Sequence, residues 1–129
     1  MKNAELVANF LKNHSKVNYV SWAGFKENIY HELAKKYFKD GFGSVFTFSL
    51  KSGYEGAMQL VENCNLISHL ANIGDTRSLI VHPASTTHRQ LSNEQKEKSG
   101  VGDSIIRLSI GLESHKDIIA DLEGALSTI

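Results

Sequence analysis

The sequence is poor in cysteine, proline and tryptophan, with one residue of each among its 129. A single cysteine, Cys64, cannot form a disulfide within the chain, and this fits a reducing compartment such as the cytoplasm. Cys64 is also a poor candidate for a nucleophile, because "VENCNL" offers no nearby cation to lower the pKa of its thiol. The composition therefore excludes a disulfide-stabilised scaffold.

An excess of charge of one sign and long apolar runs are missing too. The 14 basic and 14 acidic residues balance, which argues against a general nucleic-acid-binding protein and a polybasic membrane anchor. No apolar run approaches the roughly 20 residues of a transmembrane helix. Lys2, Glu5 and Lys12 interrupt the N-terminal segment, so we do not expect a signal peptide. With 41% apolar residues, one domain with a single core is expected over residues 1–129.

Hydrophobic periodicity predicts alternating helices and strands. Helices are expected over residues 3–13, 29–38, 52–64, 93–100 and 114–126, strands over 16–20, 44–50, 78–83 and 104–111, and a strand that runs into a loop over 66–74. This order predicts an α+β fold in which one mainly antiparallel sheet of about four strands has helices packed on one face. The opposite face would need a cover or would meet water, which suggests another domain or a partner.

Several local signals refine this prediction. Ser52, with Glu55 three residues later, fits a capping box, and Ser92 is expected to cap the helix that follows it. Trp22 and Phe25 lie in an irregular segment, where they either fill the core or belong to a surface that meets another domain. We favour the core.

In the second predicted helix, Ile29, Leu33 and Tyr37 fall on one face.

The segment "SIIRLSIGLE" places Arg107 in the middle of an apolar strand. A guanidinium keeps its charge and matches the two oxygens of a carboxylate. The segment 71–88, "ANIGDTRSLIVHPASTTH", is dense in hydroxyls and contains a glycine, and loops of this composition often form anion sites. Arg107 could therefore hold a substrate carboxylate, or it could pair with an internal carboxylate or lie at a sheet edge.

Two other patterns are weaker. His82 and His88 are six residues apart without an accompanying cysteine or carboxylate cluster, so no metal site is expected. "GFGS", residues 41–44, precedes a strand rather than a helix, which favours a turn over a phosphate-binding loop.

Three segments carry a resemblance to a known family: "SLIVHPASTTH", "GVGDSIIRLSIGLE" and "DIIADLEGAL". They resemble the C-terminal end of the cysteine/methionine-metabolism enzymes that depend on pyridoxal phosphate. The longer stretch from "YHELAKKYF" to "HPASTTH" looks most like the O-acetylhomoserine sulfhydrylases of that family. The resemblance covers essentially the whole chain, and it implies the small C-terminal domain of the fold-type I transferases.

The resemblance also implies residue roles. Arg107 matches the family arginine that binds the substrate α-carboxylate, and Ser78 matches a serine that touches the same group. Thr87 and His88 would border that cleft, and no role is assigned to them. Catalytic residues are not expected in this chain, because the lysine that holds the cofactor belongs to an earlier, larger domain of the family.

The resemblance therefore implies the C-terminal fragment of a larger cytoplasmic enzyme, which replaces the acetyl group of O-acetylhomoserine with sulfide to give homocysteine. Pyridoxal phosphate would be bound in the parent enzyme and not by this fragment, which should be inactive alone. The expected partners are the missing N-terminal domain, the amino-acid substrate and other copies of the enzyme. The alternative is a stand-alone regulatory module that binds a free amino acid.

Overall fold

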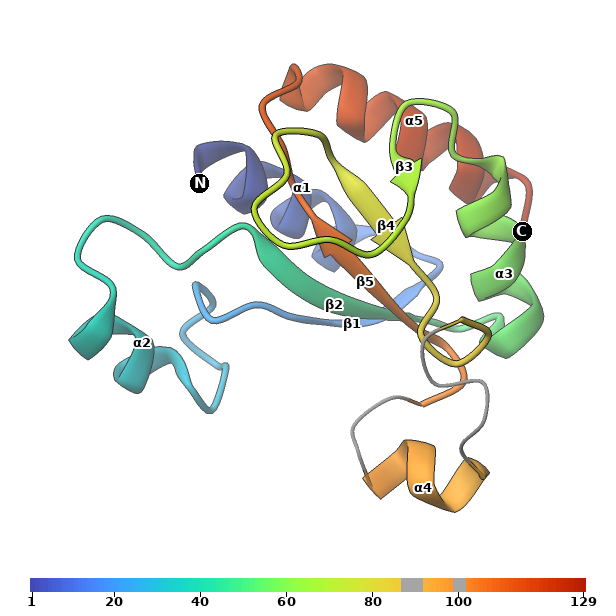
Figure 1. The fold of residues 1–129 in the computed structure, drawn as a ribbon, viewed down its shortest axis with the longest axis horizontal. Coiled ribbons are helices and arrows are strands. Elements are labelled where there is room, and N and C mark those ends of the chain that lie inside the picture. The colour runs from blue at the N-terminus through green and yellow to red at the C-terminus, as the bar shows by residue number, and fades with distance from the viewer. Residues whose placement is uncertain (87–91, 99–101) are drawn as a thin grey trace.

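The structure, a computed structural model, describes residues 1–86, 92–98 and 102–129. Figure 1 shows a sheet with longer helices beside it and short helices that project from it. Along the chain the elements are α1 (Lys2–Asn13), β1 (Val17–Ser21), α2 (His31–Tyr37), β2 (Val45–Leu50), α3 (Gly53–Asn63), β3 (Ser68–His69), β4 (Leu79–Val81), α4 (Asn93–Lys98), β5 (Ile105–Ser109) and α5 (His115–Ser127).

The sheet has the strand order β1-β2-β5-β4-β3. Its first three pairings are antiparallel, and only β3 and β4 run parallel. The predicted α+β class with a mainly antiparallel sheet is confirmed, although the sheet has five strands rather than about four. The fifth strand, β3, has only two residues and lies within residues 66–74, where a strand that runs into a loop was expected.

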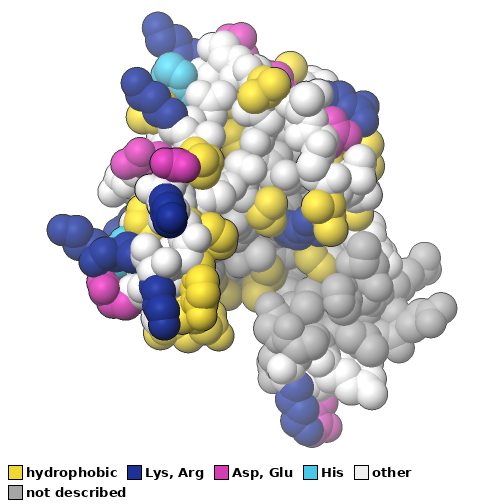
Figure 2. Space-filling model, turned by 60° about the vertical axis from the view of Figure 1, so that its left-hand side comes forward, with side chains coloured by type: hydrophobic (Ala, Val, Ile, Leu, Met, Phe, Trp, Pro, Cys, Tyr) yellow, Lys and Arg dark blue, Asp and Glu magenta, His cyan; other side chains and the backbone are white. Residues whose placement is uncertain are grey.

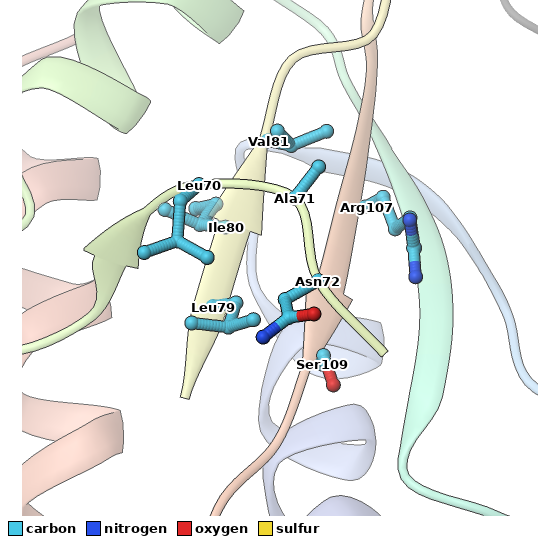
Figure 3. Close-up of a pocket in the computed structure, with 8 residues that line it drawn as sticks. All are labelled: Leu70, Ala71, Asn72, Leu79, Ile80, Val81, Arg107 and Ser109. Atoms are coloured by element: carbon cyan, nitrogen blue, oxygen red, sulfur yellow. The ribbon is translucent and has the colours of Figure 1, made fainter. Parts of the chain in front are cut away.

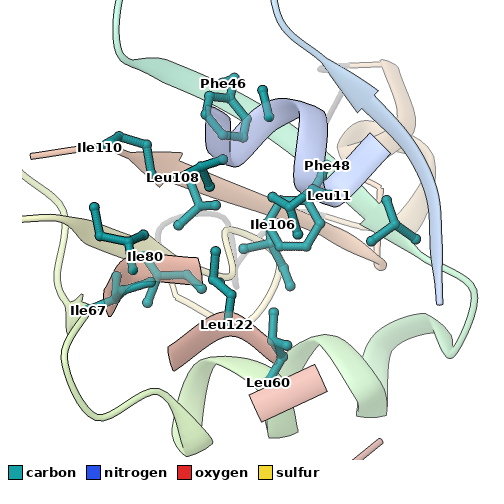
Figure 4. Close-up of a cluster of buried hydrophobic side chains, with 14 of the residues drawn as sticks. Leu11, Phe46, Phe48, Leu60, Ile67, Ile80, Ile106, Leu108, Ile110 and Leu122 are labelled. Carbon is teal, nitrogen blue, oxygen red and sulfur yellow. The ribbon is translucent and has the colours of Figure 1, made fainter. Parts of the chain in front are cut away.

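The hydrophobic core lies between the sheet and the helices α1, α3 and α5, which pack on one face as predicted. Strand alternation places every second residue of β2 and β5 on this face. Figure 4 shows these side chains meeting those of the helices, with Phe46, Phe48, Ile106 and Leu108 from the strands facing Leu60 of α3 and Leu122 of α5.

The local predictions have mixed outcomes. Ser52 precedes α3 but makes no side-chain capping bond, so the predicted capping box is wrong. Ser92 does cap α4: its hydroxyl accepts from the Gln95 amide, and its own amide donates to the Gln95 side chain. Trp22 and Phe25 are buried in edge-to-face contact, with ring centroids 5.3 Å apart, which confirms their place in the core.

The helix α2 behaves differently from the other three predicted amphipathic helices. Ile29 lies before α2, and Ile29, Leu33 and Tyr37 are all exposed, whereas α2 buries His31 and Ala34. No helix in the described part of the chain is long and apolar enough to span a bilayer.

Candidate functional site

Arg107 lies in β5, near the centre of the sheet. Its neighbours across the sheet are Thr47 of β2 and Val81 of β4. Ile106 and Leu108 point into the helix-covered core, so alternation directs Arg107 to the opposite face, where it is partly exposed. The sheet thus presents a cation on the face that α1, α3 and α5 leave uncovered.

A small, open pocket lies at this position. The loop that follows β3 crosses in front of β4 and β5 and brings Asn72 close to Ser109, whereas the side chain of Arg107 extends from β5 toward β2 (Figure 3). The apolar wall of the pocket comes from the same loop and from β4, through Leu70, Ala71, Leu79, Ile80 and Val81. The pocket therefore combines a guanidinium, an amide and a hydroxyl with an apolar side, a combination that suits a small anionic group with an apolar tail.

The guanidinium of Arg107 forms no hydrogen bond or ion pair with any residue in the ranges 1–86, 92–98 and 102–129. The internal ion pair considered from the sequence is therefore not present in the described part of the chain. A position near the centre of the sheet also rules out the sheet-edge alternative. A partly buried cation without a partner among the described residues is a candidate to bind an anion from outside them.

The loop that carries Asn72 is braced from within. The guanidinium of Arg77 donates to both oxygens of Asp75, at 3.2 and 3.0 Å, and the Arg77 amide donates to the same carboxylate at 2.9 Å. These bonds hold the pKa of the Asp75 carboxyl well below its usual range. Gly74 has a φ of 76°, a conformation that glycine adopts without strain. The loop is thus shaped by its own contacts.

Ser78 lies apart from Arg107. Its side chain is fully buried, its hydroxyl donates to Glu113 at 2.8 Å and it accepts from the Gly111 amide at 2.9 Å. Leu79 follows it on the Arg107 side of β4, so alternation turns Ser78 the other way. The structure does not bring the two predicted residues together, because they face opposite sides of the sheet. The Ser78 hydroxyl is also already bonded to Glu113. A contact between Ser78 and substrate stays a prediction, and it would require the bonds to Glu113 to break.

Glu113 lies just before α5, and its carboxylate binds the start of β4. It accepts from the Ser78 amide at 2.6 Å in addition to the hydroxyl. Partial burial of the carboxyl favours its neutral form, but the hydrogen bonds from the Ser78 amide, its own amide and the Ser78 hydroxyl outweigh this effect, and the pKa of Glu113 is lowered. This carboxylate ties the end of β5 to the end of the Asn72 loop.

The remaining candidate residues have surroundings that fit a structural role. His82 is buried, with Nδ1 2.9 Å from the Ser85 hydroxyl and Nε2 2.7 Å from the Asp103 carbonyl oxygen. Among the described residues no three metal-ligating side chains cluster. Burial, with a smaller contribution from the charge of Asp121, raises the pKa of the Cys64 thiol to about 12, so it is not an activated nucleophile. Thr87 and His88 lie outside the described residues.

The "GFGS" segment is irregular, bent backbone before β2, with positive φ at Gly41 and Gly43. It does not open a helix.

The described residues do not fit pyridoxal phosphate, which needs a lysine sheltered beside a pocket. Of the ten lysine side chains that the structure describes, nine are exposed. The tenth, Lys16, donates to the carbonyl oxygens of Leu126 and Ile129 at the end of α5. No lysine in the described ranges is placed to hold the cofactor.

Sequence reasoning found the right segment but missed Asn72. The polar run "ANIGDTR" was recognised as part of a candidate site, and Asn72 is in it. Nothing in the spacing of the residues shows which of its polar side chains turns toward β5. That choice depends on the path of the loop over the sheet, which is a tertiary feature.

Comparison with known proteins places these observations in context. A sequence model of the family described as "Cys/Met metabolism PLP-dependent enzyme" matches residues 1–127. The chain is 46% identical over 127 residues to O-acetyl-L-homoserine sulfhydrylase 1 of Thermus thermophilus and 45% identical over 128 residues to L-methionine gamma-lyase of Fusobacterium nucleatum subsp. polymorphum. These matches cover 98% and 99% of the chain but only 30% and 32% of the relatives.

A solved structure shares the fold. It is that of a Campylobacter jejuni protein assigned as an O-acetylhomoserine (thiol)-lyase, which contains N′-pyridoxyl-lysine-5′-monophosphate. The TM-score is 0.90 at 46% identity, and the match covers 98% of this chain and 30% of the other. The chain thus spans about 30% of the length of these relatives.

Proposed function

Because the chain belongs to the Cys/Met-metabolism family of enzymes that depend on pyridoxal phosphate, we propose that it is the C-terminal, substrate-carboxylate-binding domain of an O-acetylhomoserine sulfhydrylase. The whole enzyme would replace the acetate of O-acetylhomoserine with sulfide to form homocysteine. The names of the relatives support this substrate class.

The observation that carries the proposal is the state of Arg107. Its guanidinium lies in a pocket on the uncovered face of the sheet, without an ion-pair partner in the described part of the chain. The carboxylate of an amino-acid substrate fits this cation, with two parallel hydrogen bonds. Asn72 and Ser109 line the same pocket and can donate to the same group.

The chain itself would bind and orient the substrate. Fixing the carboxylate fixes the direction of the rest of the substrate, and such positioning lowers the entropic part of the barrier. The bond-making steps are assigned to pyridoxal phosphate and its lysine, which lie outside this chain. We therefore expect the chain alone to be inactive.

A chimera tests the proposal. The 127-residue counterpart in the Thermus thermophilus relative is replaced by this chain, and formation of homocysteine from O-acetyl-L-homoserine and sulfide is measured. Loss of a buried charge partner costs about 2 kcal/mol or more, so Arg107→Ala should raise KM about 30-fold or more. Lys116→Ala is the control: this lysine is exposed on α5 and does not line the pocket, so its loss should leave KM within about threefold.

Two results would contradict the proposal. One is a chimera that folds and releases methanethiol from methionine but forms no homocysteine, which would move the chain to the lyase activity. The other is micromolar binding of methionine or homoserine to the 129-residue chain alone, measured by calorimetry. That result would favour the regulatory module.

A further inference from the structure

The segment around α2 carries an unusual concentration of exposed apolar side chains. Of the eleven large apolar side chains that are exposed in the described part of the chain, five fall within residues 29–38. We call them the α2 apolar face, and their exposed fractions range from 52% to 85%: Ile29, Tyr30, Leu33, Tyr37 and Phe38. Scattered surface hydrophobic residues are normal, whereas a contiguous cluster marks an interaction surface.

The way in which α2 is attached leaves this face free. His31 anchors the helix: its ring stacks on Phe42 at 5.0 Å, and Nδ1 lies 2.8 Å from the carbonyl oxygen of Ala23. Apart from His31, only Ala34 of the helix is buried. Figure 1 shows α2 projecting from the sheet, away from α3 and α5. Seven residues are too few for a helix that is stable by itself in water, so α2 gains from a second contact.

The surface next to α2 forms an open groove. Tyr37 and Phe38 line this groove together with Met1. Figure 2 shows hydrophobic side chains gathered on the lobe that faces the viewer, with basic side chains among them. Lys36 lies over the ring of Tyr37, with its ammonium 5.7 Å from the centroid. An apolar centre with a charged rim is the usual composition of a protein interface.

We propose that the α2 apolar face docks against the part of a full-length family enzyme that has no counterpart in this chain, on an apolar surface rimmed by carboxylates. The inference rests on the proposed function, since it takes the chain as one domain of a longer enzyme. The length supports this occupant: the chain corresponds to 30% of the Thermus thermophilus relative, so more than two thirds of such an enzyme must meet this domain somewhere.

The test compares one double variant in two settings. Leu33→Ser with Tyr37→Ser removes the centre of the α2 apolar face, in the 129-residue chain and in the chimera described above. Both side chains are exposed in the chain, so its Tm should change by less than about 1 °C. In the chimera the same change should lower Tm by at least about 2 °C. Hydrogen exchange of the amides of residues 31–38 should be slower in the chimera than in the chain.

The matched control is Lys35→Ser, on another side of the same helix, where the side chain pairs with Glu32. It should leave Tm within about 1 °C in both settings, because such exposed pairs contribute little.

Several outcomes would overturn the inference. An equal decrease in Tm in both settings would show that the α2 apolar face packs within the domain itself. No loss of Tm in either setting would show that the rest of the enzyme does not cover the face. Self-association of the chain that the double variant abolishes, measured by sedimentation, would identify a second copy as the occupant. The KM effect of Arg107→Ala is read independently, so the carboxylate site and the docking face can fail separately.

Discussion

At the scale of single residues, Glu113 connects parts of the chain that are far apart in sequence. Its carboxylate binds the amide and hydroxyl of Ser78, and its backbone carbonyl accepts from the Asn3 side chain at 2.8 Å. The start of α1, the start of β4 and the end of β5 meet at this point. The site residue Arg107 and the loop with Asn72 are therefore held in register by a carboxylate that does not line their pocket.

Glu113→Gln should lower the free energy of unfolding by about 1–2 kcal/mol at pH 7, because an amide accepts these hydrogen bonds less well than a carboxylate. The pKa of Glu113 is lowered in the folded chain, so its contribution to stability is complete above the ordinary glutamate range and is lost as the pH falls through the folded value. The difference in the free energy of unfolding between the native chain and the variant should shrink between about pH 5 and pH 3. This range lies near and below the ordinary glutamate pKa of about 4.3.

Urea unfolding at several pH values measures this difference. Glu62→Gln, at an exposed position of α3, is the control and should show little difference at any pH. A difference between native and Glu113→Gln that grows as the pH falls would contradict the role assigned to the carboxylate.

Sequence reasoning was more informative for Arg107 than for Ser78. Arg107 was found because a permanent charge inside an apolar strand is conspicuous. The buried state of Ser78 was missed because a serine before a strand looks the same whether it binds a ligand or an internal carboxylate. The partner that decides between the two, Glu113, is 35 residues away. Single-sequence patterns do not report contacts at that separation.

At the scale of elements, two glycines differ in the space that surrounds them. A Cβ at Gly111 would lie 2.3 Å from the carbonyl oxygen of Thr76 and 2.5 Å from the carbonyl carbon of Arg77. The end of β5 thus approaches the Asn72 loop so closely that only glycine fits. A Cβ at Gly124, within α5, meets nothing within 4 Å.

Alanine should therefore have opposite effects at the two positions. Gly111→Ala should lower the free energy of unfolding by about 1–3 kcal/mol, since backbone atoms must move. Gly124→Ala should raise it by about 0.5–1 kcal/mol, because alanine favours the helical conformation. Chemical denaturation of both variants measures the two signs. Destabilisation by Gly124→Ala, or none by Gly111→Ala, would show that these contacts differ in solution.

The accuracy of the element predictions followed the length of the periodic pattern. The helices α1, α3 and α5 have eleven or more residues and were predicted to within about one residue at each end. The pattern of α2 gave a helix with an apolar face, but periodicity cannot tell whether the domain itself buries that face.

At the scale of the whole molecule, one hydrophobic cluster joins α1, α3 and α5 to the sheet. Calorimetry of the chain should therefore show a single transition with equal calorimetric and van't Hoff enthalpies. At about 0.7 kcal/mol per residue, the enthalpy near 60 °C should be about 90 kcal/mol. Two resolved transitions would mean that the cluster is divided.

The order of the strands affects how the chain folds during synthesis. The central pair, β2 and β5, joins residues 45–49 to residues 105–109, so the inner edge of β2 stays open while residues 51–104 leave the ribosome. Exposed strand edges readily pair with other chains. Until β5 emerges, this edge of the nascent polypeptide is therefore available for pairing with other chains.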